Sequence, residues 1–118
     1  MTVESDIYTA LKGLVSNRCF PDVAPISTVR PYITYTQIGG EAISYMENTV
    51  PDGKHGRFQV NVWADTRASA SSTMLAVEAA LIQATAFSAR PVSAPSSDYD
   101  HDMTLYGSMQ DFHVFSPR

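Results

Sequence analysis

The sequence has a single cysteine, Cys19, and no long hydrophobic run. One thiol excludes an internal disulfide framework and any metal site built from several cysteines. Beside Phe20, Cys19 is expected to be a small buried hydrophobic residue. No window approaches the ~18 unbroken apolar residues of a membrane span, so no membrane partner is expected. The opening "MTVESDIYTALKGLV" lacks the basic start and apolar run of a signal peptide. These absences predict a protein that works in the cytoplasm where it is made, or within something assembled there.

Basic residues are also scarce. The chain has 8 Lys and Arg against 12 Asp and Glu, which gives a formal net charge of −4, and the basic residues are scattered. Binding to phosphates requires Lys and Arg, so direct nucleic-acid recognition is not expected. The apolar share of 44% and the charged share of 17% are typical of an ordered globular protein. The 118 residues fit one domain, residues 1–118, with a core of its own.

No catalytic constellation is recognisable. None of the serines lies in a nucleophile-elbow sequence such as G-x-S-x-G. The histidines His55, His101 and His113 lie in or beside polar segments, without an acid at a suggestive spacing. His113 alternates with Phe112 and Val114 and is expected to point outward from a strand. The sequence therefore predicts a non-enzymatic protein with no cofactor.

One acidic segment, "SSDYDHDM", looks like a metal-binding loop at first sight. It brings Asp98, Asp100, His101 and Asp102 together in close succession. A calcium loop also needs a glycine turn and a distal acidic residue, and both are missing here. A solvated acidic loop is the favoured interpretation, and no metal site is expected.

Two segments have the apolar periodicity of helices. The first begins after Thr2, whose side chain can cap it, and the second runs from about Arg67 to Ala86 after a cap at Asp65 or Thr66. The residues expected to face the core are Val3, Ile7, Ala10, Leu11, Leu14 and Val15 in the first helix, and Ala70, Met74, Val77, Leu81 and Ala84 in the second.

Four segments are interpreted as strands. "YITYTQIGG", "AISYMENTV" and "RFQVNVWAD" follow one another with connections too short for parallel crossovers, which favours antiparallel pairing. "PDGKHG" is expected to be a hairpin tip. "MTLYGSMQDFHVF" closes the chain as one long strand or two short ones, with a bulge between Gly107 and Asp111 to reconcile a change in its apolar phase. The order of elements predicts an α+β fold, a mainly antiparallel β-sheet with two α-helices packed on one face.

Three features are candidates for contact with a partner. Two are apolar side chains that one small core does not bury, and the third is a group of basic residues. Leu75 and Ile82 form a second stripe on the second helix, which could be covered by the first helix or by a neighbouring subunit. Trp63 lies by parity on the polar face of its strand, where its own chain or a protein interface could cover it. Lys54, His55 and Arg57 concentrate positive charge at the expected tip, where a polar or acidic partner could bind.

The segments together resemble the tail completion family of tailed phages and prophages. That family is similar in fold and role to the tail terminator, or head–tail joining, proteins of long-tailed phages. The resemblance covers essentially the whole chain, and its most specific pieces are "RCFPDVAP", "PYITY" and "VNVWADT". None of these is a catalytic motif, so the resemblance depends on their joint occurrence.

The resemblance implies a structural role. Such proteins form rings, typically of six copies, that sit on the finished tail tube, stop its polymerisation and meet the head connector. It implies further copies of the chain, the tail tube protein and head-connector proteins as partners, and the virion tail or neck as location after assembly in the host cytoplasm. A ring needs two different patches on each subunit, here expected on sheet edges and helix surfaces, with Trp63, Leu75, Ile82, Lys54, His55 and Arg57 as the expected contacts. Another neck protein, or a small binding or scaffolding module, is the alternative.

Overall fold

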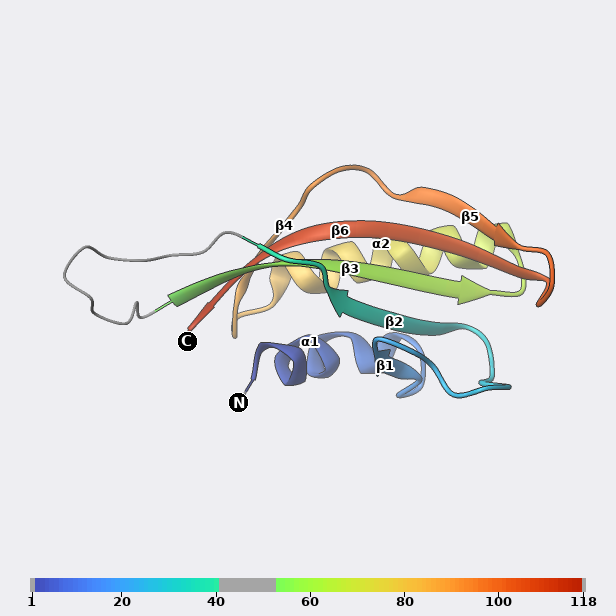
Figure 1. Cartoon of the computed structure of the whole chain (residues 1–118), viewed down its shortest axis with the longest axis horizontal. Coiled ribbons are helices and arrows are strands. Elements are labelled where there is room, and N and C mark those ends of the chain that lie inside the picture. Colours follow the sequence, from blue (N-terminus) through green and yellow to red (C-terminus); the bar gives the residue numbers. More distant parts are fainter. Residues whose placement is uncertain (1, 41–52, 118) are drawn as a thin grey trace.

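The computed structural model of the chain describes residues 2–40 and 53–117 (Figure 1). Two α-helices, a short 3₁₀ turn and six strands follow one another in an α+β arrangement. Their bounds are α1 Val3–Leu11, η1 Lys12–Leu14, β1 Cys19–Pro21, β2 Tyr32–Gln37, β3 Gly53–Ala64, α2 Arg67–Gln83, β4 Ser88–Pro91, β5 Ser96–Asp100 and β6 Leu105–Pro117.

The six strands form one sheet, in the order β1-β2-β3-β6-β4, and β5 also pairs with β6. All pairs are antiparallel except β1 with β2, which is parallel. The long strands β3 and β6 run side by side through the middle of the molecule (Figure 1). β4 and β5 both lie along the free side of β6, one near each end of that strand. The predicted fold class is confirmed, and the parallel edge strand β1 was not predicted.

Both helices begin at a threonine cap. The hydroxyl oxygen of Thr2 accepts a hydrogen bond from the Ser5 amide at 3.1 Å, and that of Thr66 accepts one from the Ser69 amide at 3.1 Å. Each bond satisfies an amide that has no partner within the helix. Thr66, not Asp65, is therefore the cap of α2. The helix ends at Gln83, earlier than predicted, because the next residue has an extended backbone.

The core lies between both helices and one face of the sheet. Phe58, Val60 and Val62 of β3 point to this face and are almost fully buried. The predicted main stripe of α2 is buried from Ala70 to Leu81. On α1 the prediction fails at Leu14, which is exposed because the tighter 3₁₀ turn changes the helical phase after Leu11. We call the other side of the sheet the open face, since both described helices lie on the core side.

The expected hairpin tip at "PDGKHG" is wrong for the residues that the structure describes. Gly53 to Gly56 are the first residues of β3, and they pair with Val114 to Pro117 of β6. The expected bulge in β6 is also wrong, because the pairing of β3 with β6 is continuous from one end to the other. The apolar phase of β6 changes for another reason. Leu105 is buried on the open face, whereas Phe112 is buried in the core.

The acidic segment is only in part a loop. Residues 96–100 form β5, and the turn follows it. A carboxylate oxygen of Asp100 accepts hydrogen bonds from the amides of Asp102 and Met103 at 3.0 and 3.2 Å, so this side chain caps the turn. The predicted strand "AISYMENTV" lies outside the described residues. Among those described, no helix is long and apolar enough to cross a membrane.

Candidate assembly surfaces

Trp63 lies on the open face, as its parity predicts. Its neighbours in the sheet are Tyr32 on β2 and Gly107 on β6. The indole also borders a hollow of about 360 Å³ that Leu105 and Asp100 help to line. Burial raises the pKa of the Tyr32 hydroxyl. Two nearby charges have smaller effects on this pKa, since Arg30 lowers it and Asp100 raises it. Trp63 itself is half-buried. Its own chain therefore covers part of the ring, and the rest lies on the surface of the sheet.

The ring of Trp63 requires glycine at position 107. A Cβ atom added there would lie 2.7 Å from Cζ3 of Trp63. We expect Gly107→Ala to lower the free energy of unfolding by about 1–3 kcal/mol, because the indole must move from its site. Urea denaturation measures this loss, and the emission of the only tryptophan reports the movement. Gly13→Ala is the control, since nothing lies within 4 Å of the added atom. Equal stability of the two variants would contradict the contact.

The three residues of the expected positive tip do not act together. By strand alternation His55 and Arg57 lie on the open face and Lys54 on the core side. Nε2 of His55 lies 2.8 Å from Nδ1 of His113, and the His55 ring also packs on Phe115 at 4.7 Å between centroids. His55 is only 9% exposed. His55 therefore packs within the sheet and contributes little to the positively charged surface.

Arg57 pairs with an acid that sequence reasoning missed. Its Nη2 lies 2.7 Å from a carboxylate oxygen of Asp111, and this acid is mostly covered. The strand register also aligns Arg57 of β3, His113 of β6 and Arg90 of β4 in one row on the open face. These partners lie between 33 and 56 residues further along the chain than Arg57. No local motif could have revealed them; only the register of β3 against β6 does. His113 lies on the open face, as predicted.

The second stripe of α2 is exposed in the subunit. Leu75 is 65% exposed and Ile82 is 51% exposed. The first helix does not cover them, because α1 packs near Ala80 and Ala84, on the other flank of α2. That alternative of the sequence analysis is excluded among the described residues.

Comparisons with known proteins agree with this architecture. The family model described as tail completion protein gp17 matches residues 6–116. A chain from a solved structure, the virion of a native gene transfer agent particle, has a similar fold, with a TM-score of 0.62 at 16% sequence identity. The alignment covers 98% of this chain and 95% of that one. A comparison with curated protein sequences gives no match.

The family match leaves out only the first five residues and the last two. It agrees with the resemblance found in the sequence and with the α+β fold. The chain therefore belongs to the tail completion protein gp17 family and is a structural protein of the phage tail, located in the virion.

Proposed function

We propose that this chain assembles as a ring, of six copies, on the end of the finished tail tube. The ring stops further addition of tube subunits and presents its other side to the head-connector proteins. The role is structural and involves no catalysis. Family membership supports the position in the tail. The exposed stripe of α2 is the observation that supports assembly of the chain with itself.

That stripe has the spacing of a helix-packing surface. Its five residues follow one another at intervals of four, three, four and three, as positions a and d of a heptad do. All five are exposed and none is charged. They are Ala68, Ser72, Leu75, Ala79 and Ile82. We call this set the outer stripe. An uncharged exposed stripe on a helix is typical of a surface that another protein covers.

A second candidate contact surface, besides the outer stripe, lies on the open face. It contains Trp63 and the row formed by Arg57 and His113. An aromatic residue that is partly exposed is a frequent anchor of protein interfaces. The open face and the outer stripe lie on opposite sides of the sheet, so one subunit offers two different surfaces. A closed ring requires this arrangement, because each copy contacts one neighbour with one surface and the other neighbour with another.

The direct test uses preformed tail tubes of the same phage. The purified chain is expected to bind at tube ends, as a ring visible by electron microscopy, and to stop elongation when more tube protein is added. A chain that leaves elongation unchanged and binds only head-connector proteins would be another neck protein. A chain that binds neither would refute the proposal and favour a general scaffolding module.

We expect the double variant Leu75→Asp with Ile82→Asp to fold normally and to lose assembly. Both side chains are mainly in water in the subunit, so the fold loses little, whereas two carboxylates in an interface cost about 2 kcal/mol or more. That corresponds to roughly 30-fold weaker ring formation or capping, measured by mass photometry and by tube elongation. Ser5→Asp adds a charge to the exposed side of α1 and is the control. Undiminished capping by the double variant would show that the outer stripe is not an interface.

A further inference from the structure

The loop between β1 and β2 carries the most exposed apolar side chains of the described chain. Ile26 is 94% exposed, Val23 is 78% exposed and Val29 is 66% exposed, and no other large hydrophobic residue among those described exceeds them. Residues 23–29 contain no charged side chain. Exposure of three large aliphatic residues on one short loop is unfavourable in water and indicates a surface that becomes covered.

The loop is held in place and presents these side chains in a fixed arrangement. Arg30 fastens one end: its Nη1 lies 3.0 Å from a carboxylate oxygen of Asp65, and its Nη2 donates to the carbonyl oxygen of Met103 at 2.8 Å. At the other end the amide of Asp22 donates to the carbonyl oxygen of Tyr35 at 2.8 Å. A loop ordered before it binds loses less conformational entropy on binding.

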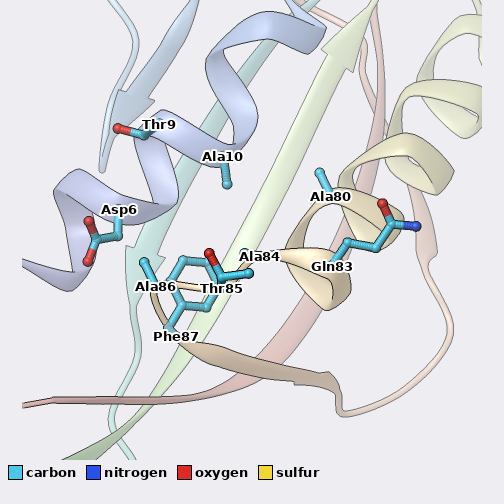
Figure 2. A pocket seen from close by; sticks show the side chains of 9 residues that line it. All are labelled: Asp6, Thr9, Ala10, Ala80, Gln83, Ala84, Thr85, Ala86 and Phe87. Carbon is cyan, nitrogen blue, oxygen red and sulfur yellow. The ribbon is translucent and has the colours of Figure 1, made fainter.

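A groove of complementary chemistry lies between the two helices. Figure 2 shows it where α1 meets the C-terminal end of α2. Its volume of about 330 Å³ falls within the range of about 300–1,000 Å³ found for binding pockets. Most of the lining is apolar. The residues that line it are Asp6, Thr9, Ala10, Ala80, Gln83, Ala84, Thr85, Ala86 and Phe87. We call this the interhelix groove.

The loop and the groove of one subunit cannot meet. The loop leaves the sheet where β3 ends and β6 begins, whereas α2 reaches the groove at the opposite end of the molecule (Figure 1). The loop presents Ile26 to solvent, with 94% of its surface exposed, whereas the groove is a hollow between two helices. The two features are thus a pair of unlike patches, which is what contact between successive copies in a ring requires.

We propose that the interhelix groove of each copy receives the loop of residues 22–31 from the next copy, with Ile26 as the central inserted side chain. This proposal rests on the ring assembly proposed above and adds one specific contact between its successive copies. The aliphatic side chains of the loop meet mainly alanine methyl groups in the groove, because the ring of Phe87 at its base is only 6% exposed. Charge agrees with this pairing. Asp6 is the single charged residue in the lining. Arg30 is already paired with Asp65, so the cation available to Asp6 is Arg18, which donates from Nε to the carbonyl oxygen of Pro31 at 3.0 Å and has no ion pair among the described residues.

Cross-linking between copies tests the contact. The variant Ile26→Cys with Gln83→Cys places one thiol at the loop tip and one at the groove rim. The native cysteine does not compete, because Cys19 is buried and burial raises its thiol pKa to about 12. After treatment of the assembled protein with a short bis-maleimide, we expect a ladder of covalent dimers, trimers and larger species that ends at the ring. Each single-cysteine variant should stop at the dimer or below.

The matched control moves the second thiol to the outer stripe. Ile26→Cys with Ser72→Cys keeps the loop thiol and uses an exposed position on the side of α2 away from α1. We expect at least tenfold less ladder from this pair. An equal or stronger ladder from it would overturn the groove as the docking site. Cross-linking of Ile26→Cys to the tail tube protein instead of to the next copy would overturn it as well.

Two results separate this proposal from the ring itself. Ring-sized particles without a ladder from positions 26 and 83 would refute the groove contact and leave the proposed function standing. Absence of any oligomer of the unmodified chain, both in solution and on tube ends, would refute the proposed function. As an independent measurement, Ile26→Ser should weaken assembly at least tenfold while the thermal midpoint of the subunit stays unchanged, since Ile26 buries almost nothing in its own chain. Unchanged assembly of this variant would count against the proposal.

Discussion

Phe58→Ala is expected to destabilise the subunit by about 3–5 kcal/mol, a large part of the total of about 5–15 kcal/mol typical of a single domain. Phe58 is 1% exposed, and it lies directly opposite Phe112 across the two central strands. Removing the ring loses its transfer free energy and leaves a cavity against a neighbour that is itself fully buried. Urea denaturation followed by circular dichroism measures the loss, which should lower the thermal midpoint by roughly 10 °C or more.

Phe115→Ala is the matched control for that measurement. Phe115 lies three residues further along β6, on the open face, and is 39% exposed. Its removal should cost about 1 kcal/mol or less, mainly through the contact with the His55 ring. If Phe115→Ala were as destabilising as Phe58→Ala, the assignment of the core to the helix side of the sheet would be wrong.

The second large effect is expected at Gln110. This side chain is 2% exposed on the core side of β6. Its Nε2 donates to a carboxylate oxygen of Glu78 at 2.9 Å and to the carbonyl oxygen of Ser93 at 2.8 Å, while its Oε1 has no partner among the described residues. Gln110→Glu would replace the donor with a second carboxylate, buried beside the first. We expect a loss of about 3–5 kcal/mol at neutral pH, as for other unpaired buried charges.

This loss should depend on pH with a defined sign. Burial and the neighbouring Glu78 would both raise the pKa of the new carboxyl in the folded state above its unfolded value of about 4.3. Below about pH 3 the group is protonated in both states and the penalty from its charge disappears. Above about pH 4.3 the unfolded state is ionised first, and relative stability falls by about 1.4 kcal/mol per pH unit until the folded state also ionises.

Gln110→Met separates charge from packing. It keeps a similar volume, removes the Oε1 atom that has no partner and leaves Glu78 to water, since that residue is half-exposed. We expect a change within about 1.5 kcal/mol and no dependence on pH between 4 and 7. Equal losses for the two variants at pH 7, with equal pH profiles, would show that size alone matters at this site.

The elements with strong periodicity were predictable from the sequence. The buried stripe of α2 and the alternation of β3 beyond Arg57 each reflect one dominant contact surface. The local pattern of apolar residues therefore predicts both the type of element and its buried side. The parity of Trp63 was predictable for the same reason. The exposed state of Leu75 and Ile82 was not, because it depends on where α1 packs.

The errors arose where a partner strand decided the structure. Residues 53–56 look like a turn because of their two glycines, yet β6 supplies a full set of backbone partners for them. Gly56 is required there, since a Cβ would lie 2.9 Å from the Phe58 ring. The segment 96–100 looks like a loop because an edge strand can be polar on both faces. The bulge was expected because Leu105 and Phe112 have opposite parity and only one face of the sheet was assumed to bury side chains. Leu105 is instead buried on the open face.

The outer strands of the sheet have a consequence for how copies of this chain can associate. β1 has three residues and finishes at Pro21, β4 has four and finishes at Pro91, and β5 carries the carboxylates of Asp98 and Asp100. Short length, proline and charge each make a strand a poor template for another chain. Backbone pairing, which can repeat without limit and produce fibres, is therefore disfavoured at these edges. Copies must then associate through side-chain surfaces, and contacts of that kind can form a closed ring with a fixed number of copies. The edges of the sheet thus protect the subunit from open-ended pairing with other chains.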